Sequence, residues 1–215
     1  MPKDTFLNLP LEKQEKVMRS SISEFLKHGF SKGNVGNIAK SAGVAKGSMY
    51  QYFENKREIF LYSVQWSIGL LVKKYEKYMI IKDTEVDIFQ FFYQNSKDMW
   101  LQMREERELV IFIQDVFLGK YNGLTDESMT YMIKVSDEYL LTLIKNGKNN
   151  GSIRNDIDDN ILSLYITGVS FKIKEYLMSK ARNLGEDIVD EDFKVNEKEI
   201  IAMIDLLKNG MGGRK

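Results

Sequence analysis

The stretch that decides the fold is residues 34–53, which read NVGNIAKSAGVAKGSMYQYF. Asn34 is one of the residue types that favour a helix N-cap, and small or branched apolar residues follow it at helical spacing. Gly43 stands where the end of a helix commonly takes a positive φ angle. A second short helix is predicted over residues 45–53. The stretch therefore predicts two short helices joined by a tight glycine turn.

Longer helices are predicted on both sides of this pair. Residues 11–28 place apolar side chains on one helical face, and Gly29 ends the pattern. After the pair, residues 55–58 read NKRE, a capping-box pattern that opens a further long helix. Three helices within about 45 residues, the last two joined by a glycine turn, are typical of the helix-turn-helix motif.

The helix predicted over residues 45–53 combines apolar positions, which would pack on the helix before it, with a row of residues that are poor core material. In that row, lysine can donate hydrogen bonds to guanine, glycine allows a close approach of the backbone, and tyrosine can donate to phosphate. Glycine in the first turn of a helix costs roughly 0.5 to 1 kcal/mol relative to alanine, so stability alone does not favour it. The row predicts a surface that reads double-stranded DNA, formed by Lys46, Gly47, Ser48, Tyr50 and Gln51.

The distribution of charge points the same way. Residues 1–60 hold 10 Lys and Arg against 6 Asp and Glu, a net charge of +4, and the remaining residues hold 21 against 25, a net charge of −4. A basic segment attached to an acidic body suits a protein that meets phosphates at one end only. Lys56 and Arg57 at the start of a helix would suit a phosphate contact as well. That these cations are ordinary solvated charges remains an alternative.

Residues 37–60 read NIAKSAGVAKGSMYQYFENKREIF, and here the chain resembles the N-terminal domain of the TetR (tetracycline repressor-like) transcriptional regulators. The resemblance rests on an alanine-glycine-valine turn, a lysine-glycine pair, a run of aromatic residues and an asparagine-lysine cap in the order typical of the family. It covers about a quarter of the chain. It implies a DNA-binding domain over residues 1–55 and a helical ligand-binding and dimerisation domain over residues 56–215.

The resemblance also implies roles for single residues. Lys46, Gly47 and Ser48 would face base edges, Tyr50 and Tyr52 would hold phosphates, and Lys56 would grip the DNA backbone. The start of the second helix, where the family also touches phosphate, corresponds to Asn34 and Val35. The chain departs from the family at two DNA-facing positions, where Ala45 replaces a common serine or threonine and Gln51 replaces a common aromatic or basic residue.

Composition excludes several classes of function. The chain has no cysteine and one histidine, His28, so thiolate metal sites and histidine-based catalysis have little to build on. We therefore expect no cofactor and no enzymatic activity. No apolar run approaches the roughly 20 residues of a membrane span, and no secretory signal is visible, which predicts a cytoplasmic protein without membrane contact. The two prolines are Pro2 and Pro10, which favours an all-α fold.

The rest of the chain is predicted to be helical, giving about nine helices in total: a three-helix helix-turn-helix domain and a larger second domain. Its aromatic residues are mostly core, but a minority could line a pocket for a small apolar or aromatic ligand. The helices around residues 161–180 and 196–208 have nearly continuous apolar faces and predict a homodimer. The candidates for the ligand pocket are Trp66, Phe89, Tyr93, Trp100, Phe112, Tyr139 and Tyr165, and those for the dimer contact are Gly168, Phe171 and Ile204.

Two functions remain open at this point. The first is a ligand-responsive repressor that binds a palindromic operator as a dimer. The second is a DNA-binding protein of the same kind whose C-terminal domain docks a protein partner. An enclosed apolar cavity of roughly 300 to 1,000 Å³ among the middle helices would favour the first.

Overall fold

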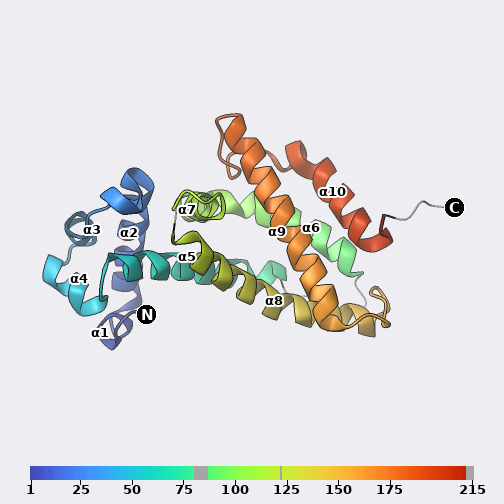
Figure 1. Ribbon diagram of the computed structural model, residues 1–215, viewed down its shortest axis with the longest axis horizontal. Coiled ribbons are helices and arrows are strands. Elements are labelled where there is room, and N and C mark those ends of the chain that lie inside the picture. The colour runs from blue at the N-terminus through green and yellow to red at the C-terminus, as the bar shows by residue number, and fades with distance from the viewer. Residues whose placement is uncertain (80–86, 122, 212–215) are drawn as a thin grey trace. The chain divides into compact units, whose positions relative to one another are not determined.

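The computed structural model describes residues 1–79, 87–121 and 123–211 (Figure 1). All regular secondary structure in these ranges is helical, which confirms the predicted all-α fold. There are ten α-helices and one 3-10 helix in the described ranges: α1 (Asp4–Leu7), α2 (Leu11–Lys32), α3 (Val35–Ala42), α4 (Lys46–Tyr52), α5 (Lys56–Met79), α6 (Ile88–Gln102), η1 (Met103–Glu106), α7 (Arg107–Phe117), α8 (Thr125–Asn149), α9 (Asp159–Asn183) and α10 (Phe193–Asn209).

The chain divides into two compact units. Unit 1 consists of Met1–Val72 and Glu108–Met129, and unit 2 consists of Lys73–Arg107 and Thr130–Lys215. The two units are defined by contacts within the chain. The domain boundary predicted between residues 55 and 56 is of another kind, because it separates a DNA-binding segment from a ligand-binding and dimerisation segment. That functional boundary stays a prediction.

An aromatic core holds unit 1 together. The ring of Phe60, on α5, lies 5.2 Å from that of Phe25 on α2 and 5.4 Å from that of Phe112 on α7, measured between centroids. The ring of Tyr121, in the loop before α8, lies 4.8 Å from that of Phe60 and is tilted by 60° to it. Burying side chains of this size contributes on the order of 2 to 3 kcal/mol each. The first helix of the predicted motif, α2, is therefore connected through Phe25 and Phe60 to residues more than fifty positions after the motif.

Two glycines set the ends of the helices in this unit. Gly29 interrupts α2 with a φ of 68°, so the regular part of the helix ends where the sequence pattern predicted. Gly43 ends α3 with a φ of 70° and a ψ of 33°, the left-handed conformation that glycine adopts without a steric cost. The N–H groups of Gly43 and Val44 donate to carbonyls of the last turn of α3, which confirms the tight turn.

Helix α1 was not predicted. Its single turn is too short to show a periodic pattern, and it is held by Phe6, which is fully buried and lies 4.8 Å from the ring of Phe53. Gln14, on α2, donates its amide to the carbonyls of Leu7 and Leu9 and so fixes the chain after α1.

Unit 2 has two hydrophobic clusters. The first joins α6, α9 and α10 around Trp100, whose indole N–H donates to the carbonyl of Glu191 at 3.0 Å. The second lies around Ile144 on α8 and includes Ile88 and Ile166. The helix predicted around residues 196–208 begins earlier in the structure, at Phe193 of α10. Asp192 is its N-cap, and Asn196 is buried inside the helix with its amide donating to Glu191.

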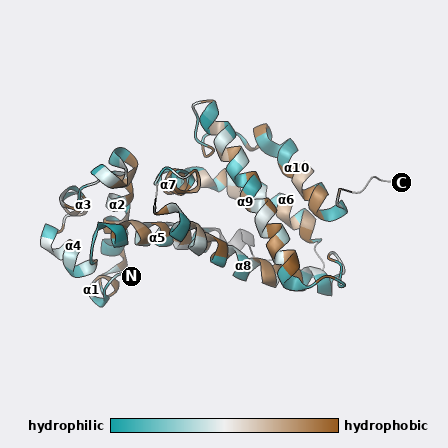
Figure 2. Cartoon of the chain, in the orientation of Figure 1, coloured by the Kyte–Doolittle hydropathy of each residue, from teal (hydrophilic) through white to brown (hydrophobic). Residues whose placement is uncertain are grey.

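Hydrophobic and hydrophilic residues alternate along the helices of both units (Figure 2). Within the described ranges, none of the helices combines the length and the apolar character that crossing a membrane requires.

Candidate nucleic-acid interface

Hydrogen bonds at its N-terminal end fix the position of helix α3. The side chain of Asn34 accepts a hydrogen bond from the N–H of Gly36 at 2.7 Å, as predicted for an N-cap. The carboxylate of Glu24, on α2, accepts from the backbone N–H of Asn34 at 2.9 Å and from the amide of Asn37 at 3.2 Å. Glu24 is almost fully buried, so this contact fixes the start of α3 against α2. The sequence analysis did not single out Glu24, because its partners lie ten or more positions away.

Helix α4 carries two opposite faces, as its sequence predicted. Met49 and Phe53 are fully buried, whereas Tyr50 keeps 46% of its surface exposed. Lys46 and Gln51 are exposed with it. Tyr50 and Lys46 each carry a hydrogen-bond donor at the end of a long exposed side chain. Donors of this kind can contact phosphates and base edges in a DNA groove.

Packing within the described residues does not explain why position 47 is a glycine. A Cβ atom built on Gly47 would meet no other atom within 4 Å, so alanine would fit there. The residue is exposed, and Ser48 beside it is half-buried. The glycine is thus left unexplained by the fold, as expected if it serves the approach of an outside molecule.

For three of the residues predicted to contact DNA, the side chain is buried or has no hydrogen-bonding group. Val35 and Tyr52 are each only 7% exposed, and Tyr52 packs on the ring of Phe6 with 5.7 Å between centroids. Ala45 is exposed and is the N-cap of α4, but it offers no side-chain hydrogen bond. A DNA contact at any of the three would have to use the main chain or, for Tyr52, the end of the ring.

Lys56 has a structural partner that the sequence did not reveal. Its ammonium group donates to the carbonyls of Ser31 and Gly33 at 3.0 and 3.1 Å and lies 4.9 Å from the centroid of the Phe30 ring. These carbonyls belong to the last turn and the C-cap of α2, so the cation ties α5 to the C-terminal end of α2. Its neighbour Arg57 pairs with Glu127 on α8. Both cations thus have partners within the described part of the chain, and a phosphate contact by Lys56 stays a prediction.

The N-terminal segment caps the end of α4. The backbone N–H of Lys3 donates to the carbonyl of Tyr52 at 2.9 Å, and its ammonium group donates to that of Tyr50 at 3.0 Å. Thr5 donates its hydroxyl to the carbonyl of Gln51. Three carbonyls at the C-terminal end of α4 are thus satisfied by residues about fifty positions earlier.

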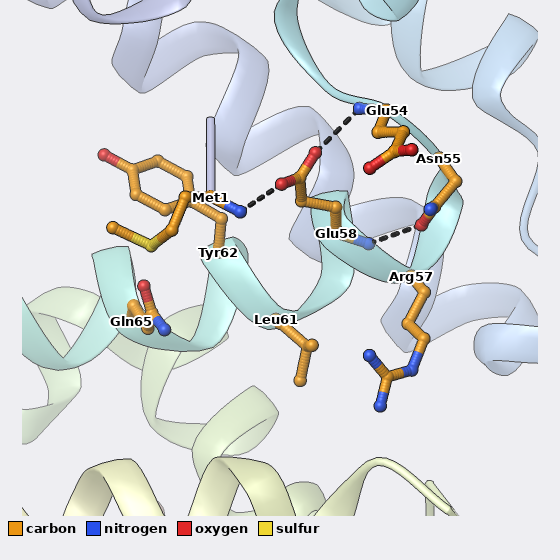
Figure 3. A pocket seen from close by; sticks show the side chains of 8 residues that line it. All are labelled: Met1, Glu54, Asn55, Arg57, Glu58, Leu61, Tyr62 and Gln65. Atoms are coloured by element: carbon orange, nitrogen blue, oxygen red, sulfur yellow. Dashed lines mark hydrogen bonds and ion pairs between the residues drawn. The ribbon is translucent and has the colours of Figure 1, made fainter. Parts of the chain in front are cut away.

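A shallow pocket of about 260 Å³ lies beside the start of α5 (Figure 3). Figure 3 shows Glu58 at its centre, accepting from the amino group of Met1 and from the N–H of Glu54, while Asn55 accepts from the N–H of Glu58. The predicted capping box is present here with a shift, since Glu58 reaches the N–H of Glu54 instead of that of Asn55. The carboxylate is already engaged, so the pocket offers little to a ligand.

The aromatic residues predicted to line a ligand pocket fall into separate groups. Trp66 and Phe112 belong to unit 1, where Trp66 lies under Arg19 and Phe112 is part of the core. Within unit 2, the first cluster includes Phe89, Tyr93 and Trp100, and the second includes Phe89 and Tyr139. Burial raises the pKa of Tyr139, so its phenol stays protonated. Tyr165 is exposed on α9.

The second pocket described, of about 50 Å³, is lined by Trp100 and its neighbours. Neither of the two pockets described is an enclosed apolar cavity of the size that the sequence analysis named as favouring a ligand-responsive protein.

The residues predicted to form a dimer contact differ in exposure. Gly168 is exposed, and a Cβ atom placed on it would meet nothing within 4 Å. It lies in a row with Ile161, Leu164, Tyr165 and Tyr176, which are all exposed on one face of α9. Phe171 is half-buried, and Ile204 is buried in the first cluster of unit 2. The exposed row of α9 is thus the stronger candidate surface, and Ile204 serves the core.

Known proteins resemble this chain in sequence over its N-terminal part and in structure over most of its length. Residues 18–62 match the family described as bacterial regulatory proteins, tetR family. The HTH-type transcriptional regulator YerO of Bacillus subtilis, itself uncharacterized, is 33% identical over 63 residues, which cover 29% of this chain and 22% of that regulator. The sequence likeness to YerO therefore spans less than a quarter of that protein.

Solved structures match over the whole fold. The regulator FadR of B. subtilis in complex with stearoyl-CoA has a TM-score of 0.68 at 19% identity, covering 92% of this chain and 99% of FadR. A TetR family transcriptional regulator from Chloroflexus aurantiacus has a TM-score of 0.59 at 25% identity, with both chains fully covered.

The arrangement of α2, α3 and α4, with one side of α4 exposed, is that of a helix-turn-helix protein. The family match over these helices agrees with that class. Residues 18–62 thus place the N-terminal helix-turn-helix segment of this chain in the tetR family of bacterial regulatory proteins. The relatives named above are regulators and not enzymes, in line with the expectation from composition.

Proposed function

We propose that this protein is a ligand-responsive transcriptional repressor that binds a palindromic DNA operator as a homodimer. The observation that carries the proposal is the division of α4 into a buried side, with Met49 and Phe53, and an exposed side, with Lys46 and Tyr50. A short helix anchored in this way and held at both ends presents its outer residues in a fixed geometry. Fixed geometry is what base readout in the major groove requires.

A homodimer is supported by the exposed row on α9. The large apolar side chains of Ile161, Leu164 and Tyr165 are not covered by any of the residues that the structure describes, and Gly168 leaves room for a second helix to approach closely. Two copies related by a twofold axis would carry two recognition helices, which suits half-sites about 34 Å apart.

The ligand is proposed to be largely apolar. The clusters of unit 2 contain the aromatic residues Phe89, Phe92, Tyr93 and Trp100, and most of these are only partly buried. The structural neighbour FadR is described in complex with stearoyl-CoA, which makes long-chain acyl-CoA the first class of compound to test. Ligand binding would lower the affinity for DNA by changing the spacing of the two recognition helices. A coupling free energy of roughly 1 to 3 kcal/mol between ligand binding and DNA binding is enough for this.

The test begins with selection of bound fragments from genomic or random DNA by the purified protein. A palindromic consensus, bound by one dimer or more, is the expected result. Titration of the selected DNA with stearoyl-CoA, with coenzyme A alone as control, then tests the response. Selection of no sequence would overturn the DNA-binding function. If no acyl-CoA or other apolar compound that binds the protein reduced operator binding, the ligand response would be excluded. The remaining function would be that of a DNA-binding regulator whose unit 2 docks a protein partner.

A further inference from the structure

Glu24 is a carboxylate in the interior of unit 1. Its neighbours on α2, Ser21 and Phe25, are fully buried, and its own side chain is only 10% exposed. Carboxylates are seldom buried to this extent, because removing a charge from water costs free energy unless the surroundings compensate it. Packing alone therefore gives no reason for a glutamate at this position.

The compensation of this charge is partial. Oε1 of Glu24 accepts from the backbone N–H of Asn34 at 2.9 Å and from the side-chain amide of Asn37 at 3.2 Å, and both donors are neutral. Oε2 lies 4.0 Å from Nε2 of His28, at the limit of an ion pair, and the His28 side chain is 50% exposed. A well-packed apolar side chain at such a position is often at least as stabilising as the charged one. The hydrogen bonds to the start of α3 are thus what the carboxylate adds.

These hydrogen bonds continue to a residue that lies beside the recognition helix α4. The side chain of Asn34 accepts from the N–H of Gly36 at 2.7 Å, so Glu24, Asn34 and Gly36 form one chain of hydrogen bonds in the first turn of α3. Lys46, the first residue of α4, lies next to this turn, because a Cβ atom built on Gly36 would meet Cδ of Lys46 at 3.7 Å. The aliphatic part of Lys46 therefore has the first turn of α3 on one side.

The first turn of α3 restricts the movement of the Lys46 side chain. Lys46 is exposed, and a lysine side chain is long and flexible. Readout of a base edge requires the ammonium group in one place, and holding a flexible side chain there costs conformational entropy. A fixed turn beside the aliphatic part lowers that cost, because fewer directions remain open before DNA binds. The position of α3 thus bears on sequence preference, and Glu24 holds α3 in that position.

We propose that Glu24 is a positioning residue for operator recognition. Its buried carboxylate fixes the first turn of α3, and this turn limits the directions in which Lys46 reaches the base edges. This role rests on the DNA-binding function proposed above and adds a residue, buried behind the DNA-facing surface, that determines sequence preference. It also accounts for a buried charge that lowers the stability of unit 1 relative to an apolar side chain.

The experiment measures the affinity of the full-length protein for the selected operator and for random DNA of the same length. The ratio of the two affinities is the informative quantity, because contacts to phosphates contribute to both affinities and cancel in the ratio. Glu24→Leu should lower the ratio about tenfold, equivalent to about 1.4 kcal/mol. The base preference should be lost at the same half-site position as in Lys46→Ala. Glu24→Gln should keep most of the ratio, since its amide oxygen can still accept from the N–H of Asn34.

The matched control is Glu15→Leu. Glu15 lies on the same helix and carries the same charge, but its carboxylate accepts from Arg19 within α2 at 2.7 Å. We expect this variant to keep the ratio. The Tm separates positioning from support of the fold, because Glu24→Leu should not lower it. A lower Tm in Glu24→Leu, or an unchanged ratio, would overturn the inference, and so would an equal loss of the ratio in Glu24→Gln and Glu24→Leu.

The double variant Glu24→Leu/Lys46→Ala tests whether Glu24 acts through Lys46. Substitutions that act through one another are not additive, so Glu24→Leu should change the ratio by less than about twofold in the Lys46→Ala background. Two independent losses that multiply would overturn the inference. These outcomes differ from a failure of the proposed DNA-binding function, in which the unaltered protein would itself bind every DNA sequence equally.

Discussion

Lys46 and Lys56, both predicted to contact DNA, differ in what surrounds their ammonium groups. Lys46 is exposed at the first position of α4, whereas Lys56 is tied to the carbonyls of Ser31 and Gly33. The sequence treated both as DNA contacts, because a local pattern shows residue types but not partners twenty-three or more positions away. The N-cap Asn34 and the turn at Gly43 were predictable, since their signals are local.

Lys46→Ala should reduce operator affinity by roughly 1 to 3 kcal/mol and relax the base preference at one position in each half-site. The physical reason is the loss of a donor to a base edge in the major groove. Binding to the selected operator and to single-base variants of it measures both effects. Lys145→Ala, an exposed lysine on α8 of unit 2, serves as a control for charge. Unchanged affinity and base preference in Lys46→Ala would contradict base readout by α4.

Lys56→Ala should lower the free energy of unfolding by about 1 to 3 kcal/mol, since two carbonyls lose a charged donor. Arg57→Ala is the matched control, because Arg57 is half-exposed and its ion pair with Glu127 is worth about 0 to 1 kcal/mol. Urea unfolding of the two variants provides the comparison. An equal, small loss in both would show that the carbonyl contacts of Lys56 contribute nothing.

At the scale of the helices, α1 is an element that the sequence pattern could not predict. Four residues carry no periodicity, and the burial of Phe6 depends on Phe53 and Tyr52, which come more than forty positions later. The helix expected around residues 196–208 starts earlier for a related reason. Asn196 and Glu199 have the spacing of a capping box, but Asp192 caps the helix first, and Asn196 is then used for a buried contact with Glu191.

Phe6→Ala should destabilise the protein by about 3 to 5 kcal/mol, the usual cost of emptying a fully buried phenylalanine site. It should also weaken operator binding under conditions where the protein is still folded, because α1 then no longer holds the carbonyl end of α4. Leu7→Ala, on the exposed side of the same helix, should change neither property by much. Thermal unfolding and operator titration at a temperature well below both transitions test the two effects. Full operator affinity in folded Phe6→Ala would mean that α4 does not need this support.

At the scale of the molecule, the exposed row on α9 makes a prediction about assembly. Leu164→Glu should convert the proposed dimer into monomers at micromolar concentration, since a charge would be buried at the centre of the contact. Leu164 is 71% exposed in the single chain, so folding should not suffer. The control is Leu184→Glu, because Leu184 is 68% exposed but lies beyond the end of α9. Sedimentation of both variants measures the outcome. A dimer that persists in Leu164→Glu would place the interface elsewhere.

The hydrogen bonds between the first residues and the end of α4 have a consequence for anyone who exchanges specificity between regulators. The match to the tetR family begins at residue 18, so a graft of residues 18–62 onto another member of the family would carry the recognition helix without Lys3 and Thr5. Three carbonyls of the transplanted helix would be left to the host's own leading residues. A chimera that includes residues 1–62 should reproduce the donor's operator choice, and the shorter graft should bind the same DNA with a looser preference.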